Sequence, residues 1–416
     1  MKNKYIPTAF GLYLNYLVHG MGVILISLNM PHLEQQWQTD AAGVSVVISS
    51  LGIGRLSLLL LAGMLSDRFG RKPFVYLGMI CYLGFFFGIL GSQSIAAAYC
   101  FGFLAGMANS FLDSGTYPSL MEAFPSSPST ANILIKAFVS GGQFLLPMII
   151  SLLVWADLWF GWSFIIAAGI MLLNGICLFR YPFPAHPGKP VRETLATEAP
   201  VRHTPPTQHA CSLVDLTSYT LYGYIAMATF YLISQWLAQY GQFVAGMSYT
   251  MSIKLLSIYT IGSLLCVVIS AVLVRKTVSS TSLLMLYTFI SFVALLGVCL
   301  YPSPNTVIVF SFVIGFSAAG GVLQLGLTLM AVRFPDAKGK ATAIYYSAGS
   351  IATFTIPLIT AKLSQTSIAS IMWFDTGVAG VGFLLALFIG YRNRKTRDNL
   401  LTEDELHVDR ALRRPS

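Results

Sequence analysis

Charged side chains are scarce in this chain of 416 residues. Only 10% of the residues are Asp, Glu, Lys or Arg, and 55% are hydrophobic, whereas soluble domains contain roughly 25% charged residues. A globule of this composition would expose large apolar areas and precipitate from water. The scarcity of charge therefore excludes a soluble globular protein.

The residue patterns of common enzyme sites are also absent. The six cysteines lie singly, without a CxxC pair, which excludes a disulfide framework and a zinc ribbon. The sequence has no Walker loop, no metal-ligand spacing and no nucleophile constellation, so we expect neither an enzyme nor a cofactor. The formal net charge of +9 comes from dispersed basic residues, a pattern that argues against nucleic-acid binding.

Long hydrophobic runs make up most of what is present. A transmembrane helix needs roughly 20 consecutive apolar residues, and such runs recur along nearly the whole chain, bounded by Pro, Gly and charged residues. They predict an all-α membrane protein of twelve transmembrane helices, six on each side of a proline-rich segment. We expect these helices at 6–28, 42–65, 73–92, 95–118, 131–155, 161–181, 213–238, 249–274, 281–301, 305–331, 341–363 and 369–391.

The proline-rich segment divides the chain into two bundles of six helices. It also carries several basic residues, so it cannot pack a core. Its histidines and its cysteine fit no known metal spacing, and we expect no metal site there. The predicted organisation is an N-terminal bundle at 1–181, a cytoplasmic linker at 182–212, a C-terminal bundle at 213–391 and a cytoplasmic tail at 392–416.

Basic residues set the expected orientation in the membrane. With the N-terminus inside the cell, about 21 of the 25 Lys and Arg residues lie in cytoplasmic loops and tails, as the positive-inside rule requires. We therefore expect a multi-pass membrane protein with both termini in the cytoplasm.

A sparse internal repeat supports the two bundles. At an offset of about 210 residues, Phe124-Pro125 aligns with Phe334-Pro335, and Ile53-Gly54 aligns with Ile261-Gly262. A six-helix unit repeated in parallel and joined by a long linker is the layout of transporters whose two halves rock about a central site.

A charged motif of ten residues connects the second and third predicted helices. It reads GMLSDRFGRK over 63–72. Its glycines allow a tight turn, and an acid followed by three bases forms a compact charge cluster at the membrane surface. The motif resembles the GxLxDRxGRK signature of the major facilitator superfamily. The resemblance extends from Tyr5 to Arg394 in the number of helices, the linker and the repeat.

This resemblance implies the major facilitator fold, with two pseudo-symmetric six-helix bundles, and a gating role for the motif. Asp67 is expected to face the positive end of the eleventh helix, near 339–341, and to latch the outward-open state. The other gating residues that the resemblance implies are Gly63, Arg68, Gly70, Arg71 and Lys72.

Two further stretches distinguish branches of the family. The fifth predicted helix reads GGQFLLP over 141–147 and lacks the Gly-Pro pair of the GPxxGG-like pattern in drug antiporters, which argues against drug export. The fourth predicted helix is similar to that of fucose-permease-like proton symporters, where an acid occupies the position of Asp113. Those relatives also have an acid in the first helix, where this chain has Asn15 and His19.

Few ionisable residues lie inside the predicted helices. An ionised group at mid-membrane costs about 2.5 to 3.5 kcal/mol on insertion scales, so each one needs a partner or a wet cavity. Arg55 and Asp113 lie roughly 16 Å from the cytoplasmic ends of their helices, so we expect them to meet. We hypothesise that Asp113 is the proton-coupling carboxylate and that Arg55 sets its proton affinity; a permanently ionised structural pair is the alternative.

His19 is the third candidate for proton coupling. It lies one helical turn from Asn15, which gives a polar stripe suited to a cavity wall; a buried, hydrogen-bonded histidine without a role in transport is the alternative. Aromatic residues of the seventh helix could stack on a substrate or simply pack. The expected cavity residues are Asn15, Asn109, Lys136, Gln143, Tyr224, Tyr231, Gln235, Lys254, Gln324 and Tyr346.

The charges expected in the cavity indicate the class of solute. Arg55, Lys136 and Lys254 outnumber Asp113, which favours a small anionic or polyhydroxylated substrate. We therefore expect a monomeric secondary active transporter that moves a small polar metabolite by alternating access with proton symport. A proton-driven exporter of small molecules is the alternative. The expected partners are the substrate, protons and the lipid bilayer.

Overall fold

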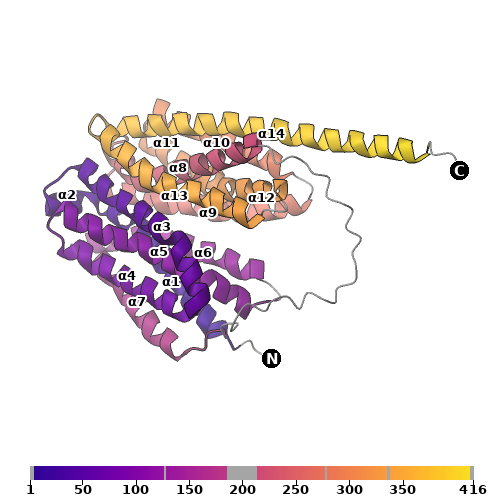
Figure 1. The fold of residues 1–416 in the computed structure, drawn as a ribbon. Coiled ribbons are helices and arrows are strands. Elements are labelled where there is room, and N and C mark those ends of the chain that lie inside the picture. Colours follow the sequence, from indigo (N-terminus) through magenta and orange to yellow (C-terminus); the bar gives the residue numbers. More distant parts are fainter. Residues whose placement is uncertain (1–3, 126–127, 185–212, 277–278, 335–337, 413–416) are drawn as a thin grey trace. The chain divides into compact units, whose positions relative to one another are not determined.

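The structure is a computed structural model that describes residues 4–125, 128–184, 213–276, 279–334 and 338–412. These residues are almost entirely helical and contain no strand (Figure 1). The helices of the first half are α1 (Ile6–Leu28), α2 (Met30–Trp37), α3 (Ala41–Phe69), α4 (Arg71–Gly91), α5 (Ile95–Ala123), α6 (Pro128–Trp155) and α7 (Trp162–Arg180). Those of the second half are α8 (Leu213–Phe243), α9 (Tyr249–Lys276), α10 (Ser280–Leu300), α11 (Pro304–Ile314), η1 (Gly315–Val322), α12 (Leu323–Arg333), α13 (Lys338–Ser364) and α14 (Ile368–Leu412).

The chain forms two compact units. The first consists of Met1–Ser212 and Thr353–Gln365, and the second of Leu213–Ala352 and Thr366–Ser416. The second half of α13 therefore packs with the first unit, where the Ser45 hydroxyl donates to the Pro357 carbonyl oxygen at 2.8 Å. Within the first unit α3 and α4 pack on α5, and α1 packs on α6; within the second, α9 packs on η1, and α8 and α10 pack on α14.

Side chains at the helix starts satisfy the first free backbone N–H groups. Asp40 accepts a hydrogen bond from the Gly43 N–H at 3.0 Å where α3 begins, and Ser94 and Ser279 cap α5 and α10 in the same way. The end of α3 depends on Gly70, whose φ of 93° is accessible mainly to glycine. Gly70 thereby turns the chain directly from α3 into α4.

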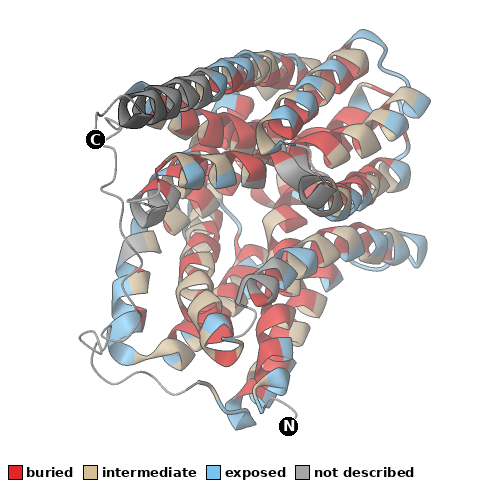
Figure 2. Cartoon of the chain, turned by 90° about the vertical axis from the view of Figure 1, so that its right-hand side faces the viewer, coloured by how far each residue is buried: buried red, intermediate tan, exposed pale blue. Residues whose placement is uncertain are grey.

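The outer surfaces of the helices suit a lipid environment. Trp155 is 84% exposed and Phe179 is 71% exposed, whereas the buried residues lie on the helix sides that face neighbouring helices (Figure 2). Among the described residues, ten helices are long and apolar enough to span a bilayer. Because lipid tails accept such surfaces and helices satisfy their own backbone groups, the structure confirms the predicted all-α membrane protein.

The helices differ from the predicted ones mainly in four places. The last helix, expected at 369–391, is α14, which continues to Leu412 through much of the segment predicted as a cytoplasmic tail. The short helix α2 was not expected, because its eight residues mix polar and apolar side chains, contain Pro31 and are too few to span a membrane. Helix α5 continues through Pro118 to Ala123, as membrane helices tolerate an internal proline. The tenth predicted span is divided into α11, the π-helix η1 and α12, because the sequence GFSAAGGV offers small residues that tolerate the wider turn.

Candidate functional site

An ion pair lies between α3 and α5 in the first unit. The Arg55 Nη2 atom is 3.1 Å from Asp113 Oδ2, and the two side chains are 22% and 18% exposed. The predicted meeting of these residues is confirmed. Each charge compensates for the hydration that the other loses in a low-dielectric interior. The pair is therefore the main pair of charges in the interior of this unit.

Two glycines bring the backbones of α3 and α5 together beside this pair. A Cβ atom at Gly54 would overlap the Phe103 carbonyl oxygen, and one at Gly106 would overlap the Leu51 carbonyl oxygen. The Ser110 hydroxyl also donates to the Arg55 carbonyl oxygen at 2.8 Å. The close helix contact therefore fixes the position from which the Arg55 side chain extends.

A tyrosine from α1 completes the immediate surroundings of Asp113. The Tyr16 hydroxyl donates to Asp113 Oδ1 at 2.6 Å, so the two carboxylate oxygens accept from two different helices. Tyr16 is buried and its ring lies edge-on to Tyr117. The sequence reasoning missed Tyr16, although its spacing of one turn from the predicted His19 was a usable signal.

His19 extends the polar group toward α4. Its Nδ1 atom is hydrogen-bonded to the Tyr82 hydroxyl, and its ring centroid is 5.8 Å from that of Tyr16. His19 is half-buried, and Tyr82 is buried. The five residues Tyr16, His19, Arg55, Tyr82 and Asp113 thus form a polar cluster, which we call the α1–α3–α5 site; it joins three of the residues predicted for proton coupling.

The other predicted cavity residues of the first unit have varied surroundings. Asn15 is fully buried and accepts a hydrogen bond from the Asn174 amide of α7 at 2.7 Å. Asn109 is half-buried one turn before Asp113, and Gln143 on α6 is buried. Lys136 is exposed on α6. Their predicted role in binding a substrate stays a prediction.

The second unit contains the rest of the predicted cavity. Tyr231 and Gln235 are buried on α8. Tyr224, Lys254 and Tyr346 are half-buried on α8, α9 and α13. The side chain of Gln324 lies outside the described residues. Whether these residues line a common cavity with those of the first unit stays a prediction.

The charged motif surrounds one arginine with acids. Arg71, the first residue of α4, is hydrogen-bonded to Asp67 of α3 and contacts Glu122 of α5 at 3.3 Å. Lys72 donates to the Phe179 carbonyl oxygen at 3.1 Å. Asp67 is 68% exposed and Arg68 is exposed, while Gly63 and Gly70 are half-buried. The predicted contact of Asp67 with the eleventh helix, near 339–341, would join the two units and stays a prediction.

The second unit holds a charge cluster that the sequence analysis did not identify. Asp215 at the start of α8 lies 2.6 Å from Arg333 at the end of α12 and 2.7 Å from Arg392 of α14. Asp215 is 4% exposed. The three helices are thus joined at one end by a carboxylate with two guanidinium partners.

The described residues contain no group of three or more His, Cys, Asp or Glu arranged to hold a metal ion. The side chains of the α1–α3–α5 site are a carboxylate, a guanidinium, an imidazole and two phenols, groups that can exchange protons and form hydrogen bonds.

Comparisons with known proteins place these features in a family. A model of the Major Facilitator Superfamily matches residues 12–303 and 255–415. The inner membrane transport protein YdiM of Escherichia coli K12 is 73% identical over 405 residues, which are 97% of this chain and 99% of that protein. The inner membrane transport protein YdiN of the same organism is 38% identical over 94% of this chain and 92% of its own length.

A solved structure supports the same fold. The crystal structure of a D-xylose-proton symporter matches with a TM-score of 0.74, at 16% identity, over 92% of this chain and 96% of its own. The family model covers most of the chain, and the relatives are named transport proteins. The chain therefore belongs to the Major Facilitator Superfamily and is a membrane transport protein rather than an enzyme.

Proposed function

We propose that the protein is a proton-coupled symporter that imports a small polar metabolite with an anionic or polyhydroxylated group. Two bundles, at 1–181 and 213–391, alternate the access of a central site between the two sides of the inner membrane. The observation that carries this proposal is the pairing of Asp113 with Arg55 and Tyr16 inside the first unit.

The geometry supports an exchange between proton and substrate at this pair. While Asp113 is ionised, it neutralises the Arg55 guanidinium. A proton on Asp113 removes its charge and frees Arg55 to bind a carboxylate or a hydroxyl group of the substrate. Loss of that proton restores the ion pair and displaces the substrate. Binding of the two cargoes is thereby linked, as symport requires.

The remaining cations favour an anionic substrate. Lys136 on α6 and Lys254 on α9 form no ion pair among the described residues. An uncompensated cation inside a membrane protein is best tolerated beside water or an anionic ligand. We expect the Lys136→Gln variant to weaken binding of a carboxylate more than binding of its amide analogue.

The function is tested with purified protein in two steps. A thermal-shift screen of sugars, sugar acids, aromatic acids and amino acids identifies a ligand, because a ligand of the folded state raises the melting temperature. Uptake of that ligand is then measured in proteoliposomes whose interior is one pH unit more alkaline than the medium. Symport of one proton per substrate gives up to about tenfold accumulation; accumulation with the opposite gradient contradicts symport and favours the exporter.

Asp113→Asn separates coupling from a purely structural ion pair. Asparagine imitates the protonated acid, so we expect loss of gradient-driven accumulation with counterflow exchange retained. A structural pair predicts loss of folded protein instead. Asp157→Asn is the matched control, because Asp157 is exposed in the loop after α6 and its φ of 52° suits asparagine.

We also propose that both termini lie in the cytoplasm and that the motif residues Asp67 and Arg71 act in gating. Single cysteines at positions 2 and 410 in a cysteine-free variant should react with a membrane-impermeant maleimide only after the cells are opened. Labelling of one terminus in intact cells contradicts this orientation.

A further inference from the structure

A second carboxyl group is buried inside the second unit without the partners that Asp113 has. Asp375 lies on α14 and is 0% exposed. Neither of its oxygens accepts a hydrogen bond among the described residues. Asp113 and Asp215, by contrast, each face at least one arginine. Asp375 thus has no visible counter-charge.

The groups around Asp375 are neutral. Thr229 on α8 interacts with it, and its titratable neighbours are Tyr259 on α9 and Cys299 on α10. The Tyr259 hydroxyl donates elsewhere, to the Phe230 carbonyl oxygen at 3.4 Å. No lysine, arginine or histidine of the described residues interacts with the carboxyl group. An ionised carboxylate in these surroundings would lose its hydration without compensation.

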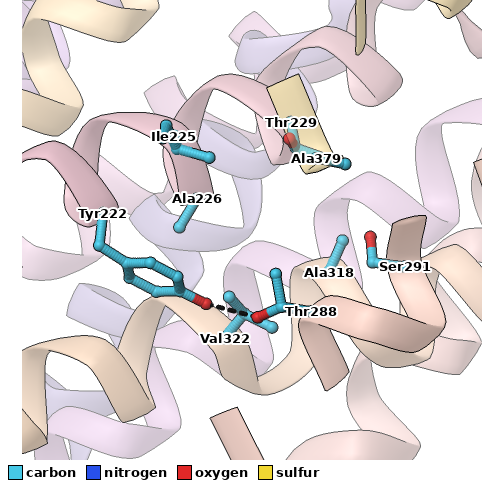
Figure 3. A pocket seen from close by; sticks show the side chains of 9 residues that line it. All are labelled: Tyr222, Ile225, Ala226, Thr229, Thr288, Ser291, Ala318, Val322 and Ala379. Atoms are coloured by element: carbon cyan, nitrogen blue, oxygen red, sulfur yellow. Dashed lines mark hydrogen bonds between the residues drawn. The ribbon is translucent and has the colours of Figure 1, made fainter. Parts of the chain in front are cut away.

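A small cavity is lined by residues close to Asp375. Its volume is about 20 Å³, enough for one water molecule. Thr229 and Ala379, which is one helical turn from Asp375, contribute to its lining, and Ser291 lies across from them (Figure 3). The hydroxyl groups of Thr229 and Ser291 are buried without a hydrogen-bond partner among the described residues. Two buried hydroxyl groups without a hydrogen bond to protein in the described residues therefore lie on the wall of one water-sized space, and one of them, on Thr229, also neighbours Asp375.

The backbone at this cavity is also unusual. Ala318 and Val322 of the π-helix η1 form part of the wall. The π-helical turn is rare, and it occurs frequently where a protein binds or reacts. It gives a second observation, independent of the buried carboxyl group, that this region is a site.

We propose that Asp375 is a proton-binding residue, protonated in this conformation, and that the cavity carries the water through which its proton exchanges. Thr229 lines the cavity and neighbours Asp375, so a hydronium ion in the cavity gives a proton to the Thr229 hydroxyl oxygen, the hydroxyl passes its own proton to a carboxylate oxygen of Asp375, and a water molecule remains in the cavity. The neutral acid can donate its O–H to the Thr229 hydroxyl, which satisfies both groups. The purpose of the site, a second proton carried during transport, rests on the proposed symport; the binding itself does not.

Infrared difference spectroscopy of the purified protein, titrated in lipid without substrate, tests the proposal. A protonated carboxylic acid has a C=O stretch that the carboxylate lacks. We expect this band in the wild-type protein at neutral pH and its loss at alkaline pH. Asp375→Asn should abolish the band, whereas Asp113→Asn, which removes an ion-paired carboxylate, should retain it. An unchanged band in Asp375→Asn overturns the proposal.

Two further arms keep the result decisive. Thr229→Val removes the polar neighbour of the acid while keeping the Asp375 side chain, so the C=O band should move to higher frequency; an unmoved band overturns the proposal even if Asp375→Asn fails to fold. Loss of the band at constant pH with sodium chloride, but not with potassium chloride, means that the site binds sodium and the proton assignment is wrong. Because no transport is measured, failure of the symport proposal would leave these spectra unaffected.

Discussion

The two units repeat the same helix packing around different interiors. In the first, Gly54 and Gly106 press α3 against α5, at the carbonyl oxygens of Phe103 and Leu51. In the second, Gly262 and Gly315 press α9 against α11 and η1, at the carbonyl oxygens of Phe312 and Tyr259. The partners correspond at the offset of about 210 residues found in the sequence. The repeat thus preserves the backbone contacts.

The side chains at corresponding interior positions are not preserved. At this offset of about 210 residues, His19 and Tyr82 correspond to Thr229 and Ser291. The first two are large and hydrogen-bonded to each other; the second two are small and line the cavity. Arg55 likewise corresponds to Ser263, and Asp113 falls near Val322. The cavity beside Asp375 therefore arises where the second unit has lost the volume that fills the first.

The ion-pair clusters of the two units also differ, because the acidic and basic residues exchange roles. In the first unit one arginine, Arg71, serves two acids. In the second one acid, Asp215, serves two arginines. An arginine is shared by two acids in one unit and an acid by two arginines in the other, which indicates that the duplicated framework constrains backbone contacts far more than ion pairs.

The largest effect is expected from the shared glycine contacts. Gly106→Ala and Gly315→Ala each place a methyl group against a backbone carbonyl that cannot rotate away, and each should destabilise the protein by about 3 kcal/mol. Gly169→Ala on α7 is the control, since a Cβ atom there meets nothing within 4 Å. Unfolding in mixed detergent measures the effect; a loss in one unit only would show that the two contacts are not equivalent.

The next largest expected effect is the loss of stability when one acid of each ion-pair cluster is neutralised. Asp215→Asn leaves two partly buried arginines facing each other and should cost about 2 kcal/mol, less than a fully buried pair because the arginines reach solvent. Asp67→Asn removes an exposed carboxylate and should cost less than about 0.5 kcal/mol. The comparison uses the same unfolding assay. Equal effects of the two variants would refute the assigned difference in burial.

Removing one hydroxyl group from each interior should have unequal effects on stability. Tyr82→Phe deletes the hydrogen bond to His19 and should destabilise the protein by about 1 kcal/mol. Ser291→Ala deletes a buried hydroxyl that has no protein partner among the described residues, so it loses at most a bond to the water proposed for the cavity and should change stability less. A larger loss of stability in Ser291→Ala than in Tyr82→Phe would contradict this order.

The smallest expected effect is a pH dependence of stability that arises from helix α2, which belongs to the first unit. Helix α2 has no equivalent after α8, where only residues 244–248 connect to α9. His32 on α2 stacks on Phe160, and burial lowers the pKa of His32 from its usual value of about 6.5. The folded state therefore binds this proton less well than the unfolded state does. The contribution of His32 is complete above about pH 6.5 and declines as the pH falls below it.

This dependence is measured as melting temperature against pH between 5 and 8. The variant His32→Phe keeps the stacked ring but cannot titrate, so it should flatten the profile in this range. A profile that is unchanged in His32→Phe assigns the dependence to another group.

The sequence predicted the helices well where hydrophobic runs have clear ends. The first helix, expected at 6–28, is α1 at Ile6–Leu28. The glycines of the repeat were a further usable signal, because Gly54 and Gly262 had been aligned, although their partners Gly106 and Gly315 had not. Proline was the less reliable marker, since Pro118 lies inside α5 rather than at its end.

The contacts between helices were harder to predict. Counting residues gave the depth of Arg55 and Asp113, and so their meeting, but depth does not give the rotation of α1 that directs Tyr16 to Asp113 and Asn15 to Asn174. Asp375 was not identified as a candidate from the sequence. Its importance depends on which helices cover it, and neighbouring helices cannot be inferred from one helix.

The glycine contact between α3 and α5 also limits what the ion pair can do during transport. Because the backbones of α3 and α5 are in direct contact, the two helices move as one rigid body. Rocking of one bundle against the other therefore does not separate Arg55 from Asp113. An ion pair that acts as a gate joins two segments that move apart during transport, whereas Arg55 and Asp113 lie on segments that stay together. Its state can change only through chemistry, by the arrival or departure of a proton or of another charged group.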